Sequence, residues 1–287
     1  MKSEINPANF IWRIVKIIIY CAMAIFSITF VGIFLWVLIN SFKTALDFMQ
    51  DALGMPKTKW DFQNYLDVFN FEYKNNNLLQ MLGNTVVMIA ISVICTVTFP
   101  VMAGYVFGRM EFKGRAKFEA FLYVLMTIPI IGGASAQLRF LSNLNLYDKY
   151  LGIFILQSGA FGGGMLILTS FFRGLPSTYA EAAYIDGAGE FTVFLKIYYP
   201  QAWPLLSINV ISSIIAVWND YMTAYIFLPT HPTIALGLQQ LQRTVDVHGS
   251  DYPLMFAGIV LTMIPVFIIF GFIAKNIFNS KDIGALK

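Results

Sequence analysis

Long apolar stretches without a charged residue alternate with short polar segments along the chain. A helix needs about 20 apolar residues to cross the hydrocarbon core of a membrane, and six charge-free stretches approach or exceed that length. They are Ile17–Phe42, Asn75–Gly108, Ala120–Leu138, Leu151–Phe172, Ile197–Asn219 and Tyr252–Ala274. The fifth stretch begins inside a polar segment, so its membrane part is expected to start near Leu205. The pattern predicts an all-α integral membrane protein with six transmembrane helices.

Basic residues are distributed unequally between the segments that join these stretches. With the N-terminus in the cytoplasm, twelve Lys and Arg residues fall on the inner side and three fall in the short outer loops. Because basic residues favour the cytoplasmic side, both termini are expected there. The basic segment Arg109–Lys117 is interpreted as a topology anchor beside anionic lipid. The first stretch is too long for the apolar part of a signal peptide and lacks a cleavage site, which predicts an uncleaved helix.

The domain organisation follows from this orientation. The expected parts are a cytoplasmic N-terminus at 1–16, a first transmembrane helix at 17–42, an extracytoplasmic loop at 43–80, a five-helix core at 81–278 and a cytoplasmic tail at 279–287. The core includes a cytoplasmic loop at 173–204, between the fourth and fifth stretches. Short helices are expected in the extracytoplasmic loop.

The loop at 173–204 has a helical pattern of its own. Thr178 followed by Glu181 predicts a capping box at the start of a short helix. Gly187 predicts the end of that helix, because glycine tolerates the left-handed backbone that helix ends often need. A second helix is expected from near Glu190 until Pro200 ends it. Its apolar stripe has helical spacing and consists of Phe191, Phe194, Leu195 and Tyr198.

Composition agrees with a membrane protein. Charged residues make up 12% of the chain and hydrophobic residues 57%, and the mean hydropathy is +0.67. A soluble domain carries about 25% charged residues. The net charge of +3 is too small to indicate nucleic-acid binding. The two cysteines, Cys21 and Cys95, lie inside apolar stretches and do not support a disulfide framework.

Two features inside the apolar stretches are candidates for a substrate path. Asp220 lies about 15 residues beyond Leu205, which is roughly 22 Å along a helix, and an ionisable residue at that depth is a functional-site hypothesis. The alternative is an Asp at the water interface or paired to a neighbouring helix. The fourth stretch contains a glycine cluster, for which close helix packing is favoured over an unwound turn that lines a cavity. The candidate path residues are Trp218, Asn219, Asp220, Tyr221, Gly162 and Gly163.

Catalytic and metal-binding patterns are not found in the sequence. No stretch fits the phosphate-binding pattern G-x-x-x-x-G-K-[ST]. His231 and His248, with scattered Asp246 and Asp251, do not make a metal site. The chain is therefore not expected to be an enzyme or to hold a cofactor, and the energy for uphill transport must come from elsewhere.

The loop at 173–204 resembles the EAA loop of ATP-binding-cassette (ABC) importer membrane subunits. The match consists of Glu181-Ala182-Ala183, Gly187, Ile197 and Pro200 in the family's order and spacing, while Tyr199 stands where the family usually has leucine. Further segments resemble the smaller, maltose-type membrane subunit of carbohydrate importers. They are Asn64-Tyr65, Asn84-Thr85, Ala103-Gly104-Tyr105 through Arg109 to Lys117, and Phe171 to Pro176.

This resemblance implies a type I importer permease for an oligosaccharide, in the cytoplasmic membrane of a bacterium. It implies four partners besides lipid: a sister permease subunit, a dimeric ABC ATPase that binds ATP and magnesium, an extracytoplasmic solute-binding protein, and the sugar. The implied ATPase-docking residues are Glu181, Ala182, Ala183, Asp186, Gly187, Phe191, Phe194, Ile197 and Pro200. The outer loop that would meet the binding protein includes His231, Gln239, Gln240, Arg243 and His248.

Two other transporter classes are considered beside this one. An ion-coupled secondary transporter would need intramembrane ionisable residues and often has inverted repeats. Asp220 is the one candidate for such a residue, and no repeat is evident. An export permease is disfavoured because the loop resembles that of importers. The sequence leaves open whether the sugar is neutral or acidic.

Overall fold

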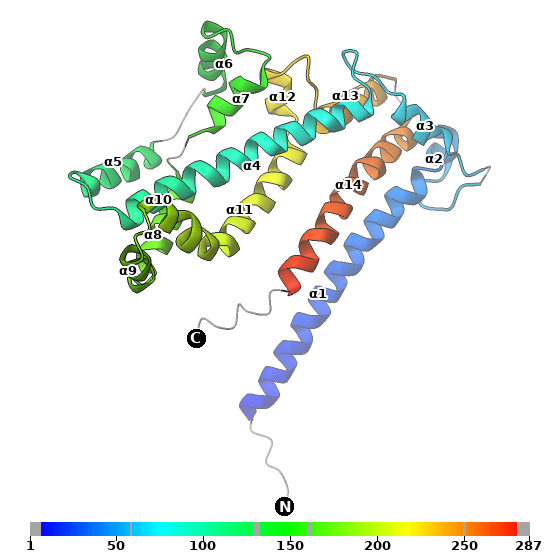
Figure 1. Cartoon of the computed structure of the whole chain (residues 1–287). Coiled ribbons are helices and arrows are strands. Elements are labelled where there is room, and N and C mark those ends of the chain that lie inside the picture. The colour runs from blue at the N-terminus through cyan, green and yellow to red at the C-terminus, as the bar shows by residue number, and fades with distance from the viewer. Residues whose placement is uncertain (1–6, 58, 129–132, 160–161, 249–250, 280–287) are drawn as a thin grey trace, which may run out of the picture. The chain divides into compact units, whose positions relative to one another are not determined.

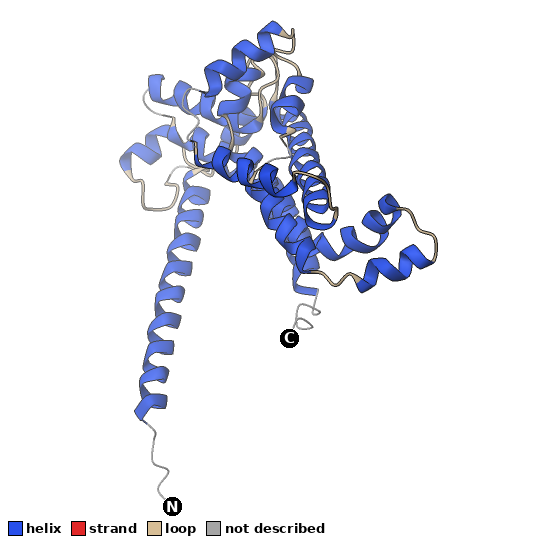
Figure 2. Cartoon of the chain, turned by 90° about the vertical axis from the view of Figure 1, so that its left-hand side faces the viewer, coloured by secondary structure: helices blue, strands red, loops and turns tan. Residues whose placement is uncertain are grey.

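The computed structural model describes residues 7–57, 59–128, 133–159, 162–248 and 251–279. Among these residues, all the regular secondary-structure elements are helices (Figure 2). The chain divides into two compact units, one formed by residues 1–71 with 240–287 and the other by residues 72–239. The prediction of an all-α protein is confirmed for the described residues.

The first unit pairs the two ends of the chain. Helix α1 (Pro7–Asn40) packs against α14 (Tyr252–Asn279), as Figure 1 shows. The rings of Phe34 and Phe267 lie 5.7 Å apart, and those of Trp36 and Phe256 lie 5.2 Å apart. The short helices expected in loop 43–80 are α2 (Ala45–Gln50) and α3 (Gln63–Phe69), and both pack on α14. Helix α13 (Ile234–His248) crosses the boundary between the two units.

The second unit is built around α4 (Leu78–Arg109). This helix packs against α8 (Gly163–Gly174) and α11 (Tyr199–Asn219) (Figure 1). Two glycines of α4 permit the contact with α8. A Cβ on Gly104 would lie 2.6 Å from Leu168 Cβ, and one on Gly108 would lie 2.8 Å from Phe172 Cβ. The remaining helices are α5 (Arg115–Thr127), α6 (Gly133–Asn143), α7 (Tyr150–Gln157), α9 (Thr178–Ile185), α10 (Glu190–Val193) and α12 (Met222–Phe227).

Within the part of the chain that the structure describes, three helical segments are long and apolar enough to cross a membrane: Trp12–Asn40, Leu78–Arg109 and Glu190–Asn219. A shorter apolar segment lies at Tyr252–Ile268. The third and fourth predicted stretches are not continuous helices, since one is divided between α5 and α6 and the other between α7 and α8. Ile128, which precedes Pro129, is extended, as expected of a residue before proline.

The glycine cluster of the fourth stretch marks the second interruption. The backbone is not helical at Ser158 and Gly159, and Gly162 is extended. A Cβ on Gly159 or Gly162 would meet nothing within 4 Å. For Gly159 and Gly162 the favoured alternative of close helix packing is therefore wrong, and the unwound turn is correct. Gly163 and Gly164 lie in α8, where a Cβ would be 3.7 Å from Met126 Cε and 3.9 Å from Pro100 Cβ.

The predicted helix end at Pro200 is also wrong. Helix continues from α10 through a π-helical turn, η1 (Phe194–Tyr198), into α11, so Pro200 lies in the first turn of α11. A proline in a helix clashes with the carbonyl four residues earlier, which is that of Lys196 in η1. Lys196 lies in the π turn, where the regular bonding pattern of the α-helix is interrupted directly before the proline. The helix of the fifth stretch accordingly begins well before Leu205.

Candidate functional site

Two short helices joined at a glycine form the polar loop between α8 and α11. Helix α9 ends with Asp186 as its C-cap, and Gly187 follows with a left-handed φ of 81°. The turn closes with hydrogen bonds from Gly187 N to Tyr184 O (3.0 Å) and from Ala188 N to Ala183 O (2.9 Å). The predicted turn at Gly187 and the second helix from Glu190 are confirmed. The name coupling loop is used below for residues 178–200.

The predicted capping box is wrong. Helix α9 begins at Thr178, so the N-cap is Ser177, and no side chain caps the helix. The backbone oxygen of Ser177 accepts hydrogen bonds from Ala180 N (2.9 Å) and Glu181 N (3.1 Å). Thr178 therefore lies one residue too far into the helix for its hydroxyl to cap it.

The coupling loop divides into a buried side and an exposed side. Phe194 and Tyr198 are buried with Val193 in a core that also contains Tyr105 and Phe172. The other two members of the predicted apolar stripe, Phe191 and Leu195, are exposed, and Ile197 is half-buried. The exposed residues of the loop include Glu181, Ala182, Asp186, Gly187 and Pro200. Ala183 is half-buried.

Large apolar side chains stand on the exposed side. Ile185 is 86% exposed and Phe191 is 66% exposed. They flank the turn at Gly187, one at the end of α9 and one at the start of α10. Contiguous exposed apolar patches with a polar rim are typical of interaction sites. Ile185 and Phe191 make the surface around Gly187 a candidate for binding another protein.

A single carboxylate joins both short helices to α4. Glu190 Oε1 accepts a 2.6 Å hydrogen bond from the hydroxyl of Tyr105 in α4. Glu190 Oε2 accepts a hydrogen bond from the hydroxyl of Tyr184 in α9. Glu190 also occupies the first turn of α10, where the helix dipole favours an anion. These bonds fix the angle between α9 and α10 and tie both helices to the central helix.

Arg109, at the end of α4, binds the segment that enters the coupling loop. Its Nη2 donates to Leu175 O (2.7 Å) and Pro176 O (3.0 Å). Its guanidinium group lies over the ring of Tyr198, 4.6 Å from the centroid. Sequence reasoning interpreted this arginine as a topology anchor and missed these contacts. Together with Glu190, Arg109 therefore joins the coupling loop to α4.

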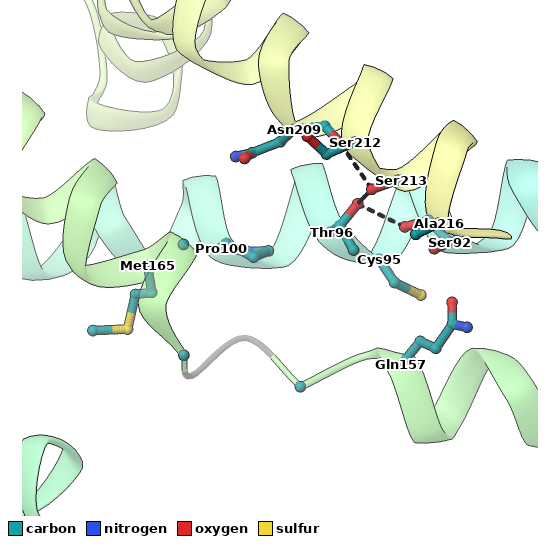
Figure 3. A pocket seen from close by; sticks show the side chains of 13 residues that line it. Ser92, Cys95, Thr96, Pro100, Gln157, Met165, Asn209, Ser212, Ser213 and Ala216 are labelled. Carbon is teal, nitrogen blue, oxygen red and sulfur yellow. Dashed lines mark hydrogen bonds between the residues drawn. The ribbon is translucent and has the colours of Figure 1, made fainter. Parts of the chain in front are cut away.

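A separate cavity of about 400 Å³ lies between α4, α8 and α11 and the end of α7 (Figure 3). Its polar lining comes from hydroxyl and amide side chains: Ser92, Thr96, Gln157, Asn209, Ser212 and Ser213. Thr96 Oγ1 and Ser213 Oγ lie 2.8 Å apart and share a hydrogen bond across the helix pair. Gly159, Gly162 and Gly164 also line the cavity.

The residues predicted for the substrate path lie in different places. Gly162 lines the cavity, whereas Gly163 does not. Trp218, Asn219, Asp220 and Tyr221 lie at the end of α11, beyond the cavity lining. The carboxylate of Asp220 accepts a hydrogen bond from the backbone N of Thr223 (3.0 Å) and another from the hydroxyl of Thr223. Asp220 thereby caps the start of α12. A role for these four residues in transport stays a prediction.

The residues predicted to contact a binding protein lie just before α13 and along its length. His231 Nδ1 is 3.4 Å from Asp148 Oδ1, and Thr230 donates to Asp148 from its backbone N (3.1 Å) and its hydroxyl (2.7 Å). Gln239, Gln240, Arg243 and His248 lie on α13. The side chain of His248 lies outside the described residues, as do residues 280–287 of the predicted tail. Among the described residues, no group of His, Cys, Asp and Glu could hold a metal ion.

Several known proteins are similar to this chain. The Diacetylchitobiose uptake system permease protein NgcG of Streptomyces coelicolor is 27% identical over 280 residues, covering 93% of this chain and 88% of that protein. The Maltodextrin transport system permease protein MdxG of Bacillus subtilis is 28% identical over 228 residues, covering 77% and 80%. Both are similar over most of their length, so the likeness is not confined to one motif.

Solved structures have the same fold. A chain of a bacterial ABC transporter involved in the import of the acidic polysaccharide alginate superposes with a TM-score of 0.74 at 21% identity, covering 92% of this chain and 96% of that chain. The family described as "Binding-protein-dependent transport system inner membrane component" matches residues 101–281, which include the whole coupling loop and the cavity lining from Gln157 onward. Since this match covers well over half of the sequence, the chain belongs to the family of inner membrane components of binding-protein-dependent transport systems.

Proposed function

We propose that this chain is a permease subunit of a bacterial ABC importer that carries an oligosaccharide across the cytoplasmic membrane. The observation that carries the proposal is the coupling loop. It exposes Ile185 and Phe191 beside Gly187 while Glu190 and Arg109 hold it to α4. Relatives named for the uptake of diacetylchitobiose and maltodextrin support an oligosaccharide as the substrate.

The proposed partners are those that an importer of this family needs. An ABC ATPase would hold ATP and magnesium, because the sequence contains no phosphate-binding loop. It would dock on the coupling loop by receiving the short helices in a groove. A sister permease would complete the translocation path, and a solute-binding protein would deliver the sugar near the start of α13.

Six crossings with both termini in the cytoplasm are part of the proposal. The α5–α6 and α7–α8 pairs would each make one interrupted crossing, since non-helical backbone at membrane depth is tolerated where it lines a cavity. The alternative of an ion-coupled transporter is not favoured by the geometry. Asp220, its candidate ion-path residue, is engaged in capping α12.

The docking surface can be tested by capture of the ATPase subunit. We expect Glu181→Lys and Ile185→Asp to lower the amount of ATPase that co-purifies with the tagged permease, because both change exposed residues of the coupling loop. Glu111→Lys is a matched charge reversal at an exposed residue outside the loop and should leave capture unchanged. Full capture by both loop variants would show that the ATPase docks elsewhere.

A further inference from the structure

The segment that directly follows α1 has a polar interior. The name outer cap is used below for residues 41–57 and 59–70, which include α2 and α3 (Figure 1). Ser41, Lys43, Asp47 and Asn64 are buried there. Lys43 Nζ donates to Asp51 O (2.7 Å), and Asn64 Nδ2 donates to Ser41 O (2.9 Å) and Lys43 O (2.8 Å). In a water-soluble fold such side chains lie mostly on the surface.

Large apolar side chains stand on the outside of the same segment. Leu53 is 87% exposed and Met49 is 67% exposed. Phe48, by contrast, holds α2 on α14, because its ring lies 5.4 Å from that of Phe256. The exposed apolar side chains of the outer cap are Leu46, Met49, Leu53, Met55, Trp60, Phe62, Leu66 and Phe69. So many on one short segment indicate a contact with another protein or with a membrane.

Helix α3 shows three different rows of side chains along its length. One row is buried, the next is exposed and apolar, and the third is exposed and polar, each with the spacing of helical turns. The rows are Asn64 and Val68, then Phe62, Leu66 and Phe69, and then Gln63, Asp67 and Asn70. A helix that lies in a membrane interface needs such a division, because it contacts hydrocarbon on one side and water on another.

The position of the outer cap at the end of α1 favours lipid over a protein partner. The apolar segment Trp12–Asn40 has 29 residues and is therefore about 44 Å long, close to the thickness of a bilayer with its headgroups, about 40–45 Å. The outer cap thus starts at the membrane surface. The ring of Phe42 lies 5.4 Å from that of Trp60 and 5.2 Å from that of Phe62. Aromatic side chains are enriched at this level of a membrane.

We propose that the outer cap is a membrane anchor, which lies in the extracytoplasmic interface with its exposed apolar side chains in the lipid. These side chains continue the exposed apolar surface of α1. Lys57 and Lys59 are exposed, and their ammonium groups reach the water-accessible layer of lipid phosphates. The inference rests on the crossing by α1 in the proposed function and goes beyond it, because a loop expected in water becomes part of the membrane-bound surface.

The test measures the depth of nitroxide spin labels in the assembled importer. The chain has only two cysteines, so Cys21→Ala with Cys95→Ala gives a cysteine-free permease. Leu53→Cys and Leu66→Cys each add one label site on the apolar surface, and Asp67→Cys is the matched control on the polar row of the same helix. The importers are reconstituted in vesicles of phosphatidylcholine and phosphatidylglycerol. Collision rates are measured with oxygen, which concentrates in hydrocarbon, and with a water-soluble nickel chelate.

We expect the labels in Leu53→Cys and Leu66→Cys to collide often with oxygen and rarely with nickel, at a depth of about 5–10 Å below the headgroups. The label in Asp67→Cys should collide with nickel several-fold more often than the label in Leu66→Cys, its neighbour in the sequence.

Two results would overturn the proposal. High nickel collision rates at all three positions would show that the outer cap stands in water. Low rates with both reagents in Leu53→Cys and Leu66→Cys would show that another protein chain covers it. Failure of the proposed function would be seen separately, because loaded binding protein would then not stimulate ATP hydrolysis by the parent importer, whatever the depths of the labels.

Discussion

Glu190 is the residue on which the geometry of the coupling loop depends most. Its two carboxylate oxygens are bound by tyrosines that lie 85 residues before it and six residues before it. Hydrogen bonds to a charged group contribute about 1.5–3 kcal/mol each, and a partner left without its acceptor adds a penalty. The carboxylate thereby converts two short helices, which would be marginal alone, into a defined surface.

We expect Glu190→Ala to destabilise the permease by about 1–3 kcal/mol and to release α9 from α4. Thermal unfolding in detergent measures the first effect, and hydrogen exchange across residues 178–193 measures the second. Tyr105→Phe removes one of the two bonds and should give a smaller change of the same kind. Unchanged exchange in Glu190→Ala would show that packing alone holds the loop.

Asp148 lies in the turn before α7 and binds Thr230 and His231 in the turn before α13. The stability of this contact is expected to depend on pH. Partial burial acts to raise the pKa of Asp148, but hydrogen bonds from Thr230 and the proximity of His231 outweigh it, so the pKa lies below its ordinary value of 3.8. A carboxyl with a lowered pKa stabilises the fold above that ordinary value, and the contribution is lost as the pH falls through the folded-state pKa.

We therefore expect Asp148→Asn to lower the melting temperature at pH 5–7, where the carboxyl of Asp148 is ionised in the parent. Below pH 3.8 the difference from the parent should shrink, since protonation of Asp148 then removes the same interaction from the parent. Melting curves of both proteins across the pH range measure this. A difference that stays the same at low pH would contradict the assignment.

Among the elements, the contact between α4 and α8 has the least room for change. Gly104 and Gly108 face Leu168 and Phe172 at distances that leave no space for a Cβ. Overpacking of this kind costs about 1–3 kcal/mol. We expect Gly104→Ala and Gly108→Ala to lower the melting temperature, while Gly83→Ala on the same helix, with nothing within 4 Å, should not. Equal stability of all three variants would show that the helices can separate without cost.

The elements were predictable from sequence where the signal is local. The apolar stretches predicted the long helices, and Gly187 predicted the left-handed turn; the structure contains both. The helix interruption at Ile128 was predictable from Pro129, because the residue before a proline disfavours helix. A prediction based only on the length of the apolar stretch does not include this effect. The continuation of helix past Pro200 had no local signal, because it depends on the π turn. The bond from Tyr105 to Glu190 joins residues 85 positions apart, and the bond from Arg109 to Leu175 joins residues 66 positions apart, so a single sequence could not place them.

At the scale of the whole molecule, the orientation in the membrane is the prediction on which the docking proposal depends. A cysteine at Lys59 should react with an impermeant reagent added outside intact cells, because loop 43–80 is expected to be extracytoplasmic. Cysteines at Lys113 and Gly189 should not react until the membrane is opened. Labelling of Gly189 from outside would contradict the orientation and the docking proposal with it.

The central claim is that the coupling loop links ATP hydrolysis on a partner to transport by this chain. Two variants test different properties of the loop. Gly187→Val forces a side chain into a left-handed turn, at a cost of about 1–2 kcal/mol. Glu181→Lys reverses a charge on the exposed side. Gly189→Ala is the control, because Gly189 has an ordinary φ of −74° and open space around its Cβ position.

The decisive measurement is ATP hydrolysis by the reconstituted importer, with and without sugar-loaded binding protein. The account predicts that loaded binding protein stimulates hydrolysis in the parent and in Gly189→Ala, and that this stimulation is lost in Gly187→Val and Glu181→Lys although both variants remain folded in the membrane. Stimulation equal to that of the parent in both loop variants would contradict the claim.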